Sequence, residues 1–151
     1  MVDWKRILVP TDFSEPAEAA LVHALEFAKQ VGASVTIVHA YHVAIPLSVP
    51  ASGGGFRMSG HIARELRARA EEAVEALARD CSKPGFVVEG RAIESPAAIA
   101  ITKEAERLSA DLIVMGTRGL TGLKHLALGS VAERVIQTAP CPVLTVHAPE
   151  G

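Results

Sequence analysis

Aromatic residues and cysteines are both scarce in this 151-residue chain: aromatics make up 4% of it, and there are two cysteines. Cys81 and Cys141 lie far apart and match no metal-binding or redox spacing, so we expect two free thiols rather than a disulfide framework. The net charge is only -2, which excludes the strong basic field that generic binding to nucleic acid or to a membrane surface requires. No apolar run approaches the ~20 residues of a membrane span.

The first residues, MVDWKRILVPTDF, contain no signal-peptide core and no small-residue cleavage site. We therefore expect a cytoplasmic protein. Hydrophobic residues make up 49% of the chain, which suits one globular domain over residues 1–151, since composition shows no linker or repeat.

Short apolar, β-branched runs alternate with segments of helical periodicity along the whole chain. The expected strands are Lys5–Pro10, Ser34–Tyr41, Phe86–Ile93, Asp111–Met115 and Pro142–His147. The expected helices run from a Ser14 cap to Val31, over His61–Cys81, from a Ser95 cap to Leu108, and over Ser130–Thr138. This order predicts an open parallel α/β sheet with helices on both faces. The stretch from His42 to Gly60 has no periodic pattern, and sequence alone does not say whether it closes over a ligand.

A glycine pattern follows the fourth expected strand. Gly116 and Gly119 are separated by two residues, and nine residues then lead to Gly129 and Ser130. Glycine lets a phosphate approach the backbone closely, and the first amides of the helix after Gly129 form an anion site together with the helix dipole. Ser130 adds a hydroxyl donor, and Arg118 can add a charge-assisted contact.

Asp12 directly follows the first expected strand, and in an open sheet ligands bind beyond the strand ends where the strand order reverses. Its carboxylate could accept hydrogen bonds from a ribose or approach a metal bound to phosphates, or it could simply begin a helix beside Ser14. The chain contains neither a Gly-Lys phosphate loop nor the G-x-G-x-x-G dinucleotide pattern. Lys124 and His125, inside the glycine segment, could contact phosphates or be solvated.

The spacing G-x2-G-x9-G-S, the opening KRILVPTDFS and the ending CPVLTVH together resemble the universal stress protein family, in its ATP-binding subclass. The resemblance covers nearly the whole chain. It implies a three-layer, Rossmann-like fold of the adenine nucleotide alpha hydrolase type, with five parallel strands in the order 3-2-1-4-5.

The resemblance also implies a ligand, ATP (or ADP or AMP) with Mg2+, and a set of residues that bind it. Asp12 would contact the ribose, and Ala40 would meet adenine through its backbone. The full set of expected nucleotide-binding residues is Pro10, Thr11, Asp12, Ala40, Met115, Gly116, Arg118, Gly119, Gly129, Ser130 and Val131.

Family members typically form homodimers through the last strand, here Pro142–His147, so we expect a homodimer and a protein partner that the sequence does not identify. No catalytic pair accompanies the glycine motif, which favours a regulatory nucleotide-binding protein over an enzyme. Two alternatives stay open. One is a slow ATPase or nucleotide transferase that uses the same site. The other is an interaction module that binds no nucleotide.

Overall fold

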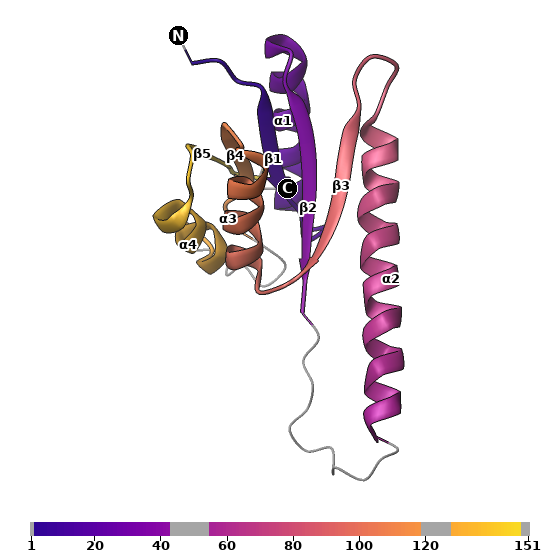
Figure 1. The fold of residues 1–151 in the computed structure, drawn as a ribbon. Helices are drawn as coiled ribbons and strands as arrows, with labels where there is room; N and C mark the ends of the chain where they lie inside the picture. The colour runs from indigo at the N-terminus through magenta and orange to yellow at the C-terminus, as the bar shows by residue number, and fades with distance from the viewer. Residues whose placement is uncertain (1, 43–54, 119–127, 149–151) are drawn as a thin grey trace.

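A parallel β-sheet forms the centre of the structure (Figure 1). The computed structural model describes the backbone of residues 2–42, 55–118 and 128–148, and the side chains of the same residues except 55–59. Five strands pair in these ranges, all in parallel and in the order β3-β2-β1-β4-β5, as predicted. They are β1 (Arg6–Pro10), β2 (Ser34–Tyr41), β3 (Val88–Glu94), β4 (Leu112–Gly116) and β5 (Val143–Val146).

Helix α1 (Glu15–Val31) begins and ends as its sequence predicts. The Ser14 hydroxyl accepts a hydrogen bond from the Ala17 amide at 3.4 Å, and Gly32 ends the helix in the left-handed conformation at φ 74°. Its buried face consists of Ala17, Ala20, Leu21, Ala24 and Ala28. Val31, the last residue of the helix, is 39% exposed.

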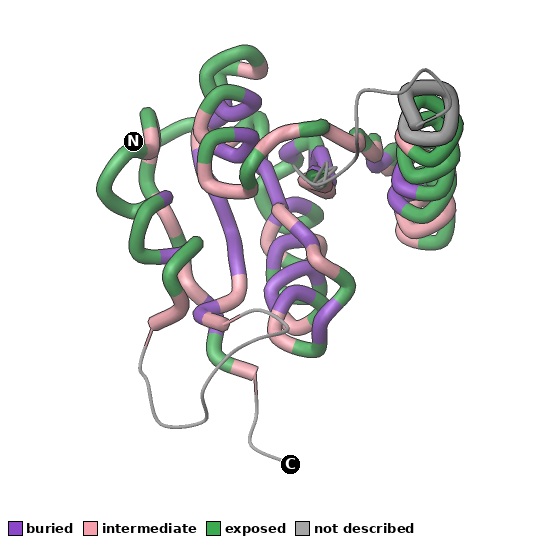
Figure 2. The backbone as a smooth tube through the Cα atoms, turned by 90° about the horizontal axis from the view of Figure 1, so that it is seen from below, coloured by how far each residue is buried: buried purple, intermediate pink, exposed green. Residues whose placement is uncertain are grey.

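Helix α2 (Gly55–Cys81) begins six residues before the predicted start at His61. It packs on β3 and β2 and continues past the end of β3, where no strand lies beside it (Figure 1). Ala70, Val74 and Ala78 form its buried contact with the sheet. Figure 2 shows the rest of the described helix as largely exposed.

Helices α3 (Ala97–Leu108) and α4 (Ser130–Thr138) pack against each other on the other side of the sheet. The prediction that Ser95 caps α3 is wrong. Pro96 occupies the cap position with no side-chain hydrogen bond, and the Ser95 amide donates instead to the Tyr41 carbonyl at 3.0 Å. The end of β2 therefore fixes the entry to α3.

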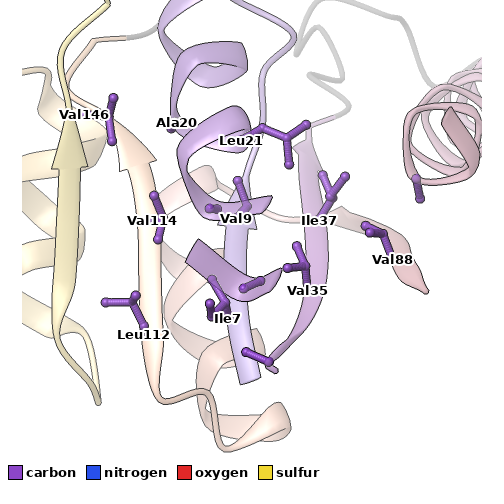
Figure 3. Packing of buried hydrophobic residues seen from close by; sticks show 14 of the residues in the cluster. Ile7, Val9, Ala20, Leu21, Val35, Ile37, Val88, Leu112, Val114 and Val146 are labelled. Carbon is purple, nitrogen blue, oxygen red and sulfur yellow. The ribbon is translucent and has the colours of Figure 1, made fainter. Parts of the chain in front are cut away.

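Buried apolar residues form two clusters, one on each face of the sheet, because neighbouring residues of a strand point to opposite faces. Figure 3 shows the first, in which Ile7, Val9, Val35, Ile37, Leu112 and Val114 pack under α1 and α2. In the second, Leu8, Val38, Ile113 and Met115 pack under α3 and α4. Three layers result, as predicted.

Trp4 forms an edge-to-face contact with Phe27 at 6.0 Å between ring centroids. Both cysteines are free thiols, as expected.

No helix in the described ranges is long and apolar enough to cross a membrane.

The contact between β3 and α2 depends on a glycine. A Cβ atom at Gly90 would lie 2.6 Å from the carbonyl oxygen of Val74, which is helix backbone and cannot rotate away. We expect Gly90→Ala to lower the free energy of unfolding by about 1–3 kcal/mol, since α2 has to shift outward. Urea denaturation measures this difference.

The matched control is Gly60→Ala, because Gly60 lies exposed within α2 and a Cβ there meets nothing within 4 Å. Replacing a helical glycine by alanine there should raise the free energy of unfolding by roughly 0.5–1 kcal/mol. If both variants changed stability in the same direction, the close packing of α2 on β3 would be contradicted.

Asp111 joins the loop after α3 to the start of β1. Its Oδ2 atom accepts hydrogen bonds from the Lys5 amide at 2.9 Å and the Arg6 amide at 2.8 Å. The pKa of the Asp111 carboxyl is lowered below its ordinary value, and the largest cause is the hydrogen bond that it accepts from the Lys5 amide. A carboxyl whose folded pKa is depressed stabilises the fold above its unfolded pKa, and the contribution is lost as the pH falls through the folded pKa.

We expect Asp111→Asn to lower the free energy of unfolding at neutral pH by about 0.5–1 kcal/mol, because these bonds are charge-assisted but solvent-exposed. The difference from wild type should shrink as the pH falls below about 4. Denaturation at a series of pH values measures it. Asp3→Asn is the control, since its ion pair with Lys5 is exposed on both sides. A pH-independent difference for Asp111→Asn would contradict the assigned role.

Candidate functional site

The strand order reverses between β1 and β4, and the two strands separate as they approach this point. Their pairing joins Ile7 with Leu112 and Leu8 with Ile113. Beyond these residues, Val9 and Pro10 pair with β2, whereas Val114 to Gly116 pair with β5. The loops that leave β1 and β4 therefore begin at neighbouring strand ends, where an open α/β sheet binds its ligands.

The loop after β1 is held by its own side chains. The Thr11 hydroxyl accepts a hydrogen bond from the Phe13 amide at 3.0 Å. The Asp12 carboxylate accepts one from the Ser14 amide at 3.0 Å and another from the Ser14 hydroxyl. Asp12 therefore supports the start of α1 through Ser14, the alternative left open from the sequence. Its contact with a ribose stays a prediction.

His39, a residue of β2, contacts the same loop. Its Nδ1 atom lies 3.0 Å from the Thr11 carbonyl oxygen, and its ring packs edge-to-face on Phe13 at 4.7 Å between centroids. Phe13 has φ 60°, a conformation that non-glycine residues rarely adopt. The loop thus keeps an unfavourable backbone angle because bonds to Thr11 and the ring contact with His39 hold it.

Ala40 offers its backbone to the same region. The Val38 carbonyl accepts from the Thr11 amide on the β1 side, and the Tyr41 carbonyl accepts from the Ser95 amide on the opposite side. Because backbone groups alternate between the two edges of a strand, the N–H and C=O of Ala40 face the β1 side. Since β1 ends at Pro10, which pairs with Val38, these groups lie beyond its last paired residue.

Two glycines of the motif have close protein neighbours. A Cβ at Gly116 would lie 2.8 Å from the carbonyl carbon and oxygen of Pro16 in the first turn of α1. A Cβ at Gly129 would lie 3.0 Å from the Thr117 carbonyl oxygen, which accepts the Gly129 amide hydrogen bond at 2.5 Å. Packing therefore accounts for both glycines, whatever a ligand adds.

The first turn of α4 lies beside the end of β4, and among the described residues no side chain caps it. Gly129 is its N-cap and gives no side-chain cap, in contrast to Ser14 of α1. The amides of the first turn have no intrahelical acceptor, and they carry the positive end of the helix dipole. Ser130 and Val131 are exposed there. Glu133, in the same turn, places a negative charge near the end of the helix and weakens its attraction for an anion.

The structure brings most of the predicted residues to the two strand ends. Pro10, Thr11 and Asp12 lie at the end of β1, Met115, Gly116 and Arg118 at the end of β4, and Gly129, Ser130 and Val131 at the start of α4. Ala40 lies near the end of β2. Gly119, Lys124 and His125 lie outside the described residues. Within the described residues, no cluster of three or more His, Cys, Asp or Glu side chains could hold a metal ion.

Sequence reasoning missed three residues that organise this region. Thr117 is 2% exposed, and its hydroxyl lies 3.2 Å from Nδ1 of His147, beyond the end of β5. The Thr117 amide donates to the Val146 carbonyl at 3.1 Å. The second residue is His147, which Thr117 contacts, and the third is Pro16, which contacts Gly116. Thr117 could have been suspected from the sequence, because it is a hydroxyl residue inside the glycine motif. Nothing in the sequence indicates that Gly116 contacts Pro16.

An open parallel α/β sheet in the order β3-β2-β1-β4-β5, with helices on both faces, defines a domain of the doubly wound class. The universal stress protein family model matches residues 3–147, and the chain belongs to this family. Universal stress protein MJ0531 of Methanocaldococcus jannaschii is 37% identical over 147 residues, which cover 97% of this chain and 84% of that protein.

Solved structures show the same fold. The structure of MJ0577, another universal stress protein of M. jannaschii, matches with a TM-score of 0.83 at 31% identity and covers 99% of this chain and 100% of its own. A universal stress protein in complex with cAMP matches with a TM-score of 0.66 at 24% identity, over 97% of this chain and 99% of its own.

The Pro16 contact yields a test that needs no ligand. We expect Gly116→Ala to lower the free energy of unfolding by about 1–3 kcal/mol in nucleotide-free protein, because its Cβ meets helix backbone. Gly129→Ala should have a smaller effect, since its neighbour has to move by only a few tenths of an ångström. Urea denaturation of both variants gives the comparison. Wild-type stability in Gly116→Ala would show that packing does not require this glycine.

Proposed function

We propose that this universal stress protein binds ATP, with Mg2+, where β1 and β4 separate, and acts as a regulatory homodimer whose nucleotide state a protein partner recognises. The observation that carries the proposal is the start of α4. Its first-turn amides are uncapped and adjoin the end of β4, where Thr117 holds Gly129 in place. Such a helix start attracts phosphate.

The phosphate end of ATP would bind the amides of Ser130 and Val131, with the Ser130 hydroxyl and the Arg118 guanidinium as further donors. The bound Mg2+ would reduce the charge on the phosphates and hence their repulsion from Glu133. The described residues supply the amides for this site but no ready metal cluster, so the metal would bind mainly through phosphate oxygens.

The adenosine end would lie across the ends of β1 and β2. The backbone N–H and C=O of Ala40 form a donor and acceptor pair that matches the edge of adenine. Thr11 and Asp12 lie on the loop after β1, and β1 lies between β2 and β4 in the sheet, so these two residues would meet the ribose. A universal stress protein of similar fold was solved in complex with cAMP, which supports an adenine nucleotide as the ligand.

The homodimer would form through β5, which lies at one edge of the sheet. An unpaired edge strand readily pairs with another chain. Leu144 of this strand is 47% exposed and would be covered in a dimer. Because β5 pairs with β4 and His147 contacts Thr117, the dimer edge adjoins the phosphate site. This connection is a direct route by which nucleotide binding could change the dimer surface.

The contacts of Asp12 and His39, two polar residues near the site, favour a regulatory role over a catalytic one. Phosphoryl transfer requires a residue that orients the attacking group. Asp12 supports Ser14, and His39 contacts the Thr11 carbonyl. Slow hydrolysis of ATP at the same site is the second possibility, and multiple-turnover release of phosphate would establish it.

The role of the start of α4 in phosphate binding can be tested by removing one of its backbone N–H donors. Ser130→Pro removes an N–H donor at the first position of α4, where proline suits the helix, and the φ and ψ of Gly129 suit a following proline. Loss of a charge-assisted hydrogen bond weakens binding by about tenfold or more. Isothermal titration calorimetry with ATP and Mg2+ should show this loss, with no change in melting temperature.

Ser130→Ala is the matched control, because it keeps the amide and removes only the hydroxyl. Its ATP affinity should fall by about fivefold or less. Wild-type affinity in Ser130→Pro would place the phosphates elsewhere. Absence of ATP binding by the wild-type protein would reject the proposal and leave an interaction module.

A further inference from the structure

A cavity lies near the amino ends of the strands, at the end of the sheet opposite the candidate nucleotide site. Its volume is about 250 Å3, and residues of β1, β2 and the β3 region line it together with Leu108 and Ala110. It exists because α3 ends at Leu108, where Ser109 takes the left-handed conformation at φ 49°. The helix therefore stops before it covers the first residues of the strands on this face.

Thr36 presents an unused hydroxyl in this cavity. The residue is only 8% exposed and lines the cavity. Within the described part of the chain, its side chain has no hydrogen-bond partner. No buried side-chain polar atom in the described residues lacks a hydrogen-bond partner, so the Thr36 hydroxyl oxygen is accessible from the cavity although the residue as a whole is largely buried. It can therefore donate to a polar ligand or an ordered water molecule.

Charges of opposite sign flank Thr36. Glu89 is its direct neighbour on the strand at one side, and Arg6, which pairs with Ser34, lies on the strand at the other side. Both line the cavity, and neither forms an ion pair within the described residues. The nearby charged groups have other partners.

Each of those nearby groups has its partner within hydrogen-bond distance. Asp111 accepts from the backbone amides of Lys5 and Arg6. Arg107 donates to Glu104 from Nε at 3.0 Å and from Nη2 at 2.6 Å, and Arg91 also contacts Glu104, at 2.7 Å. The Arg6 guanidinium and the Glu89 carboxylate line the cavity and would meet a ligand there, although Arg6 also interacts electrostatically with Asp111, and Glu89 with Arg107.

We propose that this cavity is a second binding site, for a small zwitterion of the α-amino-acid class with an aliphatic side chain. The carboxylate of the ligand would bind Arg6 and the Thr36 hydroxyl, and its ammonium group would bind Glu89. Leu108 and Ala110 would contact the aliphatic part. The volume is below the range of drug-sized sites and suits a molecule of roughly ten heavy atoms. This site does not depend on the proposed nucleotide site.

The probe is L-leucine, titrated into nucleotide-free, 15N-labelled protein and followed by backbone amide chemical shifts. A ligand of this size should bind with about millimolar affinity. We expect saturable shifts at Ser34, Thr36, Glu89 and Ala110. Two matched probes lack one charge each: 4-methylpentanoate has no ammonium group, and 3-methylbutylamine has no carboxylate. Each should bind at least about fivefold more weakly than L-leucine.

Thr36→Val keeps the shape of the side chain and removes the hydroxyl, so the fold should be preserved and L-leucine affinity should fall about fivefold. Arg6→Gln should remove the advantage of L-leucine over 3-methylbutylamine, and Glu89→Gln its advantage over 4-methylpentanoate. Lys103→Gln and Glu106→Gln, exposed charge changes on α3, are the controls and should leave affinity unchanged.

The proposal is overturned if L-leucine causes no saturable shifts at these amides. Equal binding of all three probes, or wild-type affinity in Thr36→Val, would also overturn it, because the cavity would then be a hydrated or unselective surface. ATP titrated into the same sample gives a separate answer about the nucleotide site, so failure of either proposal is visible by itself.

Discussion

The close contact between the end of β4 and the first turn of α1 is the constraint on which the rest of the site depends. Gly116 lies against the Pro16 backbone with no room for a side chain. This contact holds the loop from Thr11 to Ser14 beside β4. From the other side, the Thr117 carbonyl holds the Gly129 amide and so fixes the start of α4. Two helix starts and two strand exits therefore meet where the sheet reverses its order.

The sequence predicts the layers and both ends of α1 well, because these depend on local chemistry. Apolar strands covered on both faces, the Ser14 cap and the Gly32 end of α1 are all local signals. The misplaced features depend on distant contacts. The start of α2 lies in a stretch without periodicity. The entry to α3 is set by the hydrogen bond from the Ser95 amide, which lies between β3 and α3, to the carbonyl of Tyr41 at the end of β2.

The sequence predicts that the residues of the candidate site gather at neighbouring strand ends, but it does not predict the contacts that hold them there. The glycine spacing indicates Gly116, Gly129 and Ser130, and the structure places them with Asp12 at neighbouring strand ends. Sequence could not show that Gly116 is also required by Pro16, or that His39 holds the Thr11 carbonyl. Such residues act through tertiary packing, where a side chain meets a backbone group far away in the chain. Gly116 and Gly129 of the motif therefore have packing roles that do not depend on a ligand.

The central claim is that an adenine nucleotide occupies the point where β1 and β4 separate. The most direct measurement is a map of backbone amide shifts in 15N-labelled protein on addition of ATP with Mg2+. The account predicts saturable shifts at Thr11, Ala40, Thr117 and Ser130, with none at Thr36 or Glu89 at the other end of the sheet. Saturable shifts confined to other parts of the chain, or no shifts at all, would contradict it.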